Sequence, residues 1–258
     1  MGICSENSTI QLLGVEISAL RMNEVLDIVN EHIASRNNLL IGVVNVAKIV
    51  NMRKDPGLRE SVEEADLVLA DGAPIVWLSR MLRKPLPERV AGIDLMHRLL
   101  QQANERRYRV YFLGAKPEVL QKVAAAVQSE YPGVQVTGFR DGYFGKKDEE
   151  SVAQAIRDSR TDILLVAISS PKKEIFLRKW RSLMNVPVCH GVGGSFDVMA
   201  GVIKRAPIWM QKHGLEWLYR LVQEPRRMWK RYLVTNAIFL NLSLMAVLQD
   251  RVRRLLHK

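Results

Sequence analysis

The chain has 258 residues and a formal net charge of +11, from 38 Lys and Arg against 27 Asp and Glu. Hydrophobic residues make up 48% of it and charged residues 25%, which is ordinary for a folded protein and argues against long disorder or repeats. Its two cysteines, Cys4 and Cys189, form no ligand-spaced cluster with the five histidines, which argues against a disulfide framework or a structural zinc site.

The first six residues carry neither the apolar core of a signal peptide nor the Ser or Thr that an N-myristoylation motif has at position 6. We therefore expect the protein to stay on the cytoplasmic side of the membrane.

Short β-branched runs alternate with longer amphipathic stretches between residue 10 and about residue 190. This rhythm is typical of βαβ units, so we predict an α/β fold, with a Rossmann-like, mainly parallel sheet and helices on both faces. The expected strands are residues 39–44, 66–70, 109–113, 134–137, 163–168 and 186–190. The expected helices, with apolar residues three and four apart, are residues 22–34, 92–106, 118–130, 149–159 and 173–184.

Polar and turn-forming residues follow several of these strands, among them Asn45, Asp71 and the segments 169–174 and 190–194. In open α/β sheets, ligands bind in the crevice beyond the carboxyl ends of the strands. We therefore expect the functional site among these residues.

Asp71 is the most informative carboxylate, because it closes an apolar strand and precedes Gly72, which lets the backbone turn tightly. A carboxylate in that place can accept a proton from a substrate hydroxyl. The alternative is a structural role as N-cap of a helix that begins at Ala73.

The turn Gly191-Val192-Gly193-Gly194 can present backbone N–H groups to a diphosphate. It is not a full dinucleotide fingerprint, because Phe196 stands at the third glycine position, and the chain has no P-loop. Asp197 is placed either to bind a ribose or base, or to cap a helix.

The chain contains no Asp-x-Asp and no close set of carboxylates and histidines, so we expect no metal and no cofactor. A nucleotide diphosphate would then be neutralised by arginine and lysine, which bind phosphate well. Arg89, which follows a Pro-rich loop, either points into the crevice or pairs with Glu88 at the surface. Further candidates in the tail are Arg205, Arg220, Arg226, Arg227, Lys230 and Arg231.

The last 58 residues carry most of the charge, since residues 201–258 hold twelve Lys and Arg against three acids, or +9 of the +11. Three of the five tryptophans and an apolar run at 233–248 lie there too, a combination that suits an anionic membrane surface. The run is shorter than the roughly 20 apolar residues of a membrane span, which favours a helix at the interface or one packed on the core. We predict an α/β domain of residues 1–198 and a helical C-terminal appendage of residues 199–258, with breaks near Pro207 and Pro225.

Four motifs in this order resemble the WecB/TagA/CpsF family of glycosyltransferases, and the resemblance covers about residues 10–235. The motifs are residues 70–72 (ADG), 87–95 (PERVAGIDL), 191–197 (GVGGSFD) and 205–227 (RAP, EWLYRL and EPRR).

The resemblance implies inverting transfer from a UDP-sugar to a sugar on a polyprenyl-diphosphate lipid, during assembly of a bacterial surface polysaccharide. It implies that Asp71 is the general base, that Asn45 and Arg89 line the pocket, and that the appendage closes over the donor with Arg220 and Arg227 and contacts the membrane. With the turn residues above, the expected binding residues are Asn45, Gly72, Arg89, Lys173, Gly193, Gly194, Asp197, Arg220 and Arg227.

Two positions depart from the family pattern. Many members have Thr-x-Asn where this chain has Val43-Val44-Asn45, and Gln-Glu where it has Lys173-Glu174. The expected donor is therefore UDP-N-acetylmannosamine or a similar sugar, its uronic acid, or a hexose, and Lys173 favours either an acidic sugar or contact with the acceptor diphosphate.

Two other interpretations stay open from the sequence. A non-enzymatic nucleotide-binding module would use the basic tail to hold a nucleic acid, whereas our prediction includes no nucleic-acid partner. The same fold would also serve hydrolysis or epimerisation of a nucleotide sugar. The apolar appendage further suggests a homo-oligomer.

Overall fold

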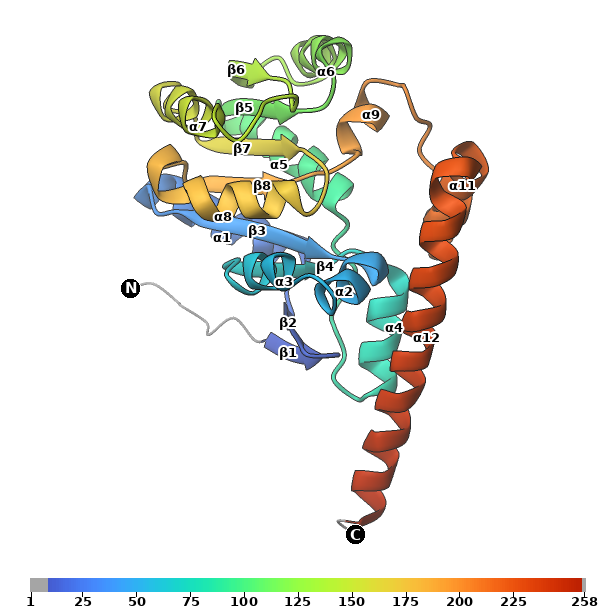
Figure 1. Ribbon diagram of the computed structural model, residues 1–258. Helices are drawn as coiled ribbons and strands as arrows, with labels where there is room; N and C mark the ends of the chain where they lie inside the picture. The colour runs from blue at the N-terminus through green and yellow to red at the C-terminus, as the bar shows by residue number, and fades with distance from the viewer. Residues whose placement is uncertain (1–8, 257–258) are drawn as a thin grey trace.

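The computed structural model describes residues 9–256, apart from the side chain of Arg227. The expectations for residues 1–6 and for Cys4 therefore lie outside the described part. Six strands form one sheet in which every neighbouring pair is parallel. In spatial order they are β4 (Leu67–Ala70), β3 (Leu39–Val44), β8 (Val188–Gly191), β7 (Ile163–Ala167), β5 (Arg109–Gly114) and β6 (Gln135–Arg140) (Figure 1).

Both faces of the sheet are covered, because alternate residues of each strand enter different hydrophobic clusters. Ile41 and Phe112 lie in a cluster with α1 (Met22–Ser35), α5 (Gly92–Arg106) and α6 (Pro117–Glu130). Their neighbours Leu40 and Tyr111 lie in one with α7 (Glu149–Asp158) and α8 (Lys172–Met184). Val44 and Val68 pack with α2 (Val46–Met52), α3 (Pro56–Glu63) and α4 (Ala73–Met81). The predicted two-sided parallel sheet is confirmed.

The hairpin of β1 (Thr9–Leu12) and β2 (Val15–Ser18), together with α2 and α3, is absent from the sequence prediction. The hairpin strands have four residues each, too few to display an alternating pattern, and they turn through Leu13 and Gly14, both with positive φ. The helix α2 is seven residues long, which is under two turns of helical periodicity.

The appendage consists of short helices followed by one long helix, and the predicted breaks at Pro207 and Pro225 are present. These helices are α10 (Ile208–Lys212), α11 (Glu216–Gln223) and α12 (Pro225–Leu256). The predicted domain boundary after residue 198 falls inside α9 (Ser195–Met199), whose Phe196 is buried in the core beside Phe112. The division into two domains stays a prediction.

The 32-residue helix α12 runs along the body, and its C-terminal end projects away from it (Figure 1). Its inner face is buried through Met228, Thr235, Phe239 and Val247, and the last two join the cluster that includes α2. Its outer face leaves large apolar side chains in solvent: Trp229, Leu233, Val234, Leu240, Leu244, Met245, Leu248, Val252, Leu255 and Leu256.

The segment Met228–Leu256 is long and apolar enough to cross a membrane by length and composition, with a mean hydropathy of 1.5 in its most apolar window. The sequence prediction considered only the shorter run at 233–248. Only 11% of that window is buried, although its inner stripe packs on the core.

Candidate active site

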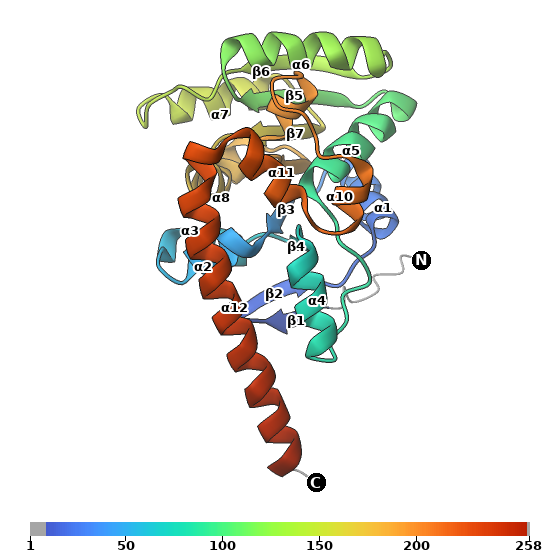
Figure 2. The same ribbon diagram turned by 90° about the vertical axis from the view of Figure 1, so that its right-hand side faces the viewer.

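Asp71 lies directly beyond the carboxyl end of β4, at the edge of the sheet that Figure 2 views with α10 and α11 in front. Its backbone N–H donates to Val44 O at 2.8 Å, and Val90 N–H donates to Ala70 O at 3.0 Å. These bonds hold the segment that carries Arg89 beside Asp71. The N-cap of α4 is Gly72, and no side chain caps that helix, so the capping role considered for Asp71 is not observed.

Asp71 has an unusual proton affinity for a carboxyl. Its burial raises the pKa from 3.8 to about 6. Arg89 and Lys48 act to lower it, and so does a hydrogen bond from the backbone N–H of Gly92. A carboxylate whose pKa lies just below neutral pH is ionised there and still has appreciable proton affinity, as a general base requires.

A buried ionic cluster lies next to Asp71, at the carboxyl end of β3. Lys48 Nζ lies 2.9 Å from Glu174 Oε1 and donates to Val43 O at 2.6 Å, while Lys173 Nζ lies 3.4 Å from the same carboxylate. Burial and the neighbouring Lys48 lower the pKa of Lys173 to about 8. Although Glu174 is also buried, the two lysines hold its pKa at about 2. The cluster thus keeps two cations against one anion.

Lys173 extends across β8 over Gly191, which has no side chain. A Cβ at this position would lie only 2.6 Å from Lys173 Cε and would displace the lysine. The adjacent His190 is fully buried, with Nδ1 3.4 Å from Ile41 O and Nε2 3.2 Å from Gly92 O. Burial lowers the pKa of His190 to about 4, so the ring is neutral at physiological pH and joins β3 to the start of α5.

The glycine turn after β8 receives an arginine from the appendage. Gly193 has φ 56, and Gly194 precedes α9. A Cβ on Gly194 would lie 2.8 Å from Arg220 Nη2, so the guanidinium rests directly on the turn. The sequence predicted that both the turn and Arg220 contribute to the site, and the fold brings them together.

Arg89 is paired differently from the surface pairing considered for it. Glu88 accepts a hydrogen bond from the backbone N–H of Met22, while Arg89 donates to Glu216 at the start of α11. Arg89 also lies 3.6 Å from Asp94 Oδ2. Arg89 therefore connects the core to the appendage at the edge of the site.

Other predicted residues lie at the same edge or outside the described part. Asn45 caps α2, accepting from Lys48 N–H at 3.0 Å, and Gly72 has φ 155, a conformation that residues with side chains rarely adopt. Asp197 lies in α9, two residues after the helix begins. The side chain of Arg227 is outside the described residues. Arg226, Lys230 and Arg231 of the tail are exposed.

Lys48, Glu216 and Asp94 were not predicted as site residues. Lys48 lies one turn into the helix that Asn45 starts, and Glu216 lies four residues before Arg220 in the motif EWLYRL. Their helical spacing from two predicted site residues could therefore have identified both. Among residues 9–256, no three His, Cys, Asp or Glu side chains gather as a metal site.

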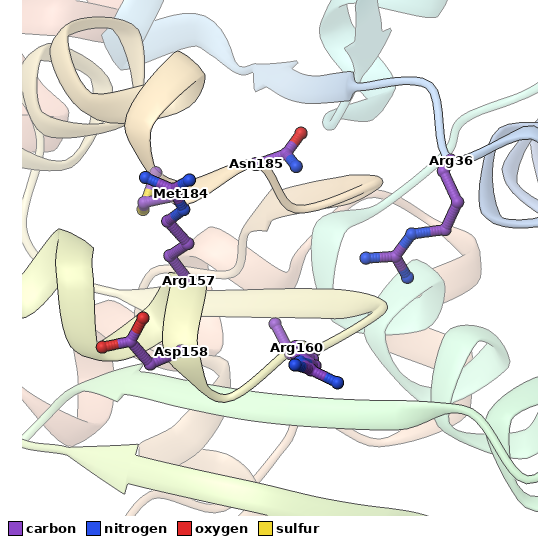
Figure 3. Close-up of a pocket in the computed structure, with 7 residues that line it drawn as sticks. Arg36, Arg157, Asp158, Arg160, Met184 and Asn185 are labelled. Atoms are coloured by element: carbon purple, nitrogen blue, oxygen red, sulfur yellow. The ribbon is translucent and has the colours of Figure 1, made fainter.

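A hollow of about 350 Å³ lies at the opposite, amino edge of the sheet and is lined by residues at the C-terminal ends of α1, α7 and α8. Figure 3 shows Arg36, Arg157, Arg160 and Asn185 around it. Arg36 is already paired with Asp162 at 2.6 Å. Because ligands of open α/β sheets bind at the carboxyl edge, we take the side of Asp71 as the candidate active site.

Comparisons with known proteins show what the chain is similar to. The sequence profile of the Glycosyl transferase WecG/TagA/CpsF family matches residues 10–254. A relative from Bacillus spizizenii is 39% identical over 180 residues, covering 70% of this chain and 69% of the relative. One from Bacillus subtilis is 36% identical over 213 residues, covering 82% of each chain. Both relatives are named N-acetylglucosaminyldiphosphoundecaprenol N-acetyl-beta-D-mannosaminyltransferase.

Proposed function

Because this chain belongs to the WecG/TagA/CpsF family of glycosyltransferases, we propose that it transfers a sugar from a UDP-sugar to a polyprenyl-diphosphate-linked sugar, with inversion. The product enters bacterial surface polysaccharide biosynthesis. The observation that carries the proposal is the Asp71 carboxylate, whose pKa of about 6 suits a general base. Two cations from separate elements, Lys48 and Arg89, lie near it.

In the proposed reaction, Asp71 takes the proton of the acceptor hydroxyl while that oxygen forms a bond to the anomeric carbon. The bond from this carbon to the UDP oxygen breaks, and UDP leaves with the bonding electron pair. Attack and departure on opposite faces invert the anomeric configuration. Such general-base assistance contributes about 10²–10⁴-fold to a rate.

The leaving diphosphate is stabilised by Arg220 and by backbone N–H groups of the turn at Gly193 and Gly194 on which Arg220 rests. Arginine forms paired hydrogen bonds to phosphate oxygens and stays protonated, so the charge is neutralised without a metal ion. Asn45, Gly72, Arg89, Asp197 and Arg227 complete the proposed binding set.

The donor is proposed to be UDP-N-acetylmannosamine, its uronic acid or a hexose; the names of the two relatives, which are N-acetyl-beta-D-mannosaminyltransferases, support the first of these. Lys173 is buried beside Glu174 and lies within the field of Asp71, and we propose that it contacts a carboxylate or phosphate of a substrate. Assaying these donors against a polyprenyl-diphosphate-N-acetylglucosamine tests this directly. A β-linked product from an α-linked donor supports the proposal, and an α-linked product or mere hydrolysis contradicts it.

We propose a peripheral position on the inner face of the membrane. The outer face of α12 leaves Leu244 and Leu248 exposed, and α10 adds Ile208 and Trp209. Apolar side chains next to basic ones bind anionic bilayers. The packing of Phe239 and Val247 on the core supports a helix along the bilayer surface.

Flotation with phosphatidylglycerol vesicles tests this placement. Replacing Leu244 and Leu248 together by Asp is expected to release the protein. Phe139→Asp, at an exposed apolar residue on the edge strand β6, is the matched control and is expected to float as the wild type does. Equal flotation of all three proteins contradicts the placement.

A further inference from the structure

Four side chains of alternating charge form a closed ring between the core and the appendage. Arg89 and Asp94 come from the core, and Arg205 and Glu216 come from the appendage. Arg89 donates to Glu216, and Arg205 Nη2 lies 2.5 Å from Asp94 Oδ1. The ring is closed by Arg89 with Asp94 and by Arg205 with Glu216, each at 3.6 Å.

Each charge of this ring has two neighbours of opposite sign, and all four side chains are partly buried, with exposed fractions between 21% and 36%. Networks with such geometry hold more strongly than isolated surface pairs, which contribute about 0–1 kcal/mol. Removing one carboxylate leaves two guanidinium groups close together with a single counter-charge. Glu216 is therefore central both to the docking of α11 and to the orientation of Arg89.

We infer that Glu216 is a positioning residue that holds Arg89 in the ring and keeps its guanidinium from pairing directly with the nearby Asp71 carboxylate, and that through the ring it latches the appendage over the carboxyl ends of the strands. Glu216 does not touch the reacting atoms; it acts through Arg89 and through its own charge. The catalytic importance of this latch rests on the proposed role of Asp71, whereas its existence does not.

The charges that face Asp71 determine what loss of Glu216 does. Arg89 and Lys48 favour its ionised form, and Glu216 opposes it. Lys173 of α8 and Tyr232 of α12 also lie within its electrostatic reach. Removing the negative charge of Glu216 stabilises the Asp71 carboxylate directly. It also frees Arg89 to turn toward Asp71, which stabilises the carboxylate further. Both effects lower the pKa of Asp71.

The test is to titrate Asp71 in the full-length protein, following the ¹³C resonance of its carboxyl carbon, which is assigned by its loss in Asp71→Asn. The wild-type midpoint is expected near pH 6. In Glu216→Gln we expect it to fall by about half a unit or more. The control Glu64→Gln removes a carboxylate of an exposed pair with Arg178 and is expected to leave the midpoint in place. An unchanged or raised midpoint in Glu216→Gln overturns the inference.

Tryptic cleavage after Lys204 and Arg205 provides a second, independent measurement. Glu216→Gln and Asp94→Asn are both expected to accelerate the cleavage severalfold, because the segment between α9 and α10 that carries both cleavage sites then detaches from the core more often. Glu64→Gln is expected to leave the cleavage rate unchanged. Rates equal to the wild type in both ring variants overturn the latch. If Asp71→Asn retains full transferase activity, the proposed mechanism fails, and the titration and the cleavage still decide the latch.

Discussion

The guanidinium of Arg220 lies on Gly194, so close that a Cβ at this glycine would be 2.8 Å from Nη2 and 3.3 Å from Nη1. One residue belongs to the appendage and the other to the turn after β8, and they are 26 positions apart in sequence. The contact places a charge from the basic tail at the carboxyl edge of the sheet. The tail therefore brings a positive charge to the candidate site in addition to presenting an apolar face.

Gly194→Ala is expected to weaken binding of UDP about tenfold or more, because the methyl group displaces Arg220 and its charge-assisted hydrogen bonds to phosphate. Isothermal titration with UDP measures the effect. Gly57→Ala, where the new methyl group would meet only ordinary contacts in α3, is the control and is expected to bind UDP normally. Unaltered affinity in Gly194→Ala contradicts the placement of Arg220 against the diphosphate.

Glu174→Gln is expected to lower the free energy of unfolding by about 3–5 kcal/mol, because Lys48 and Lys173 are then buried without their counter-charge. Urea denaturation at pH 7 measures this loss. The exposed Glu64→Gln is expected to change the free energy by about 1 kcal/mol or less. Equal losses in the two variants show that the buried cluster does not stabilise the fold.

Asp71→Asn is expected to stabilise the protein at pH 8 and to have little effect below pH 4. The folded-state pKa of about 6 exceeds the value of 3.8 for the unfolded chain, so the folded carboxylate carries an electrostatic cost that is complete above pH 6 and absent below 3.8. The cost amounts to about 2–3 kcal/mol. Urea denaturation at both pH values checks it, and a variant no more stable than the wild type at pH 8 contradicts the raised pKa.

The sequence predicts the sheet well, because each central strand is a continuous apolar run, which is typical of a parallel sheet covered on both faces. The bounds of the helix 92–106 agree with the structure, since the stripe from Leu95 to Ala103 follows a regular helical spacing. The β1–β2 hairpin escapes prediction because its strands have four residues each, and their burial depends on contacts with the distant α2 and α4.

The site is predictable where it follows strand ends and less so where it depends on long-range pairing. The positions of Asp71 and of the glycine turn follow from the ends of the predicted strands, whereas the role proposed for Asp71 also rests on the family resemblance. The partner of Arg89 does not, because Glu216 is 127 positions away and enters the site only when α11 docks. The one partner that sequence spacing offered for Arg89 was the neighbouring Glu88, as an alternative to pointing into the crevice, and Glu88 instead accepts from Met22 N–H, 66 positions earlier.

We propose above all that Asp71 is the general base of glycosyl transfer. The most direct measurement is the turnover of Asp71→Asn with UDP-N-acetylmannosamine and a polyprenyl-diphosphate-N-acetylglucosamine, alongside its affinity for UDP. We predict a loss of about 10²–10⁴-fold in turnover with UDP affinity retained. Turnover close to that of the wild type would contradict the account.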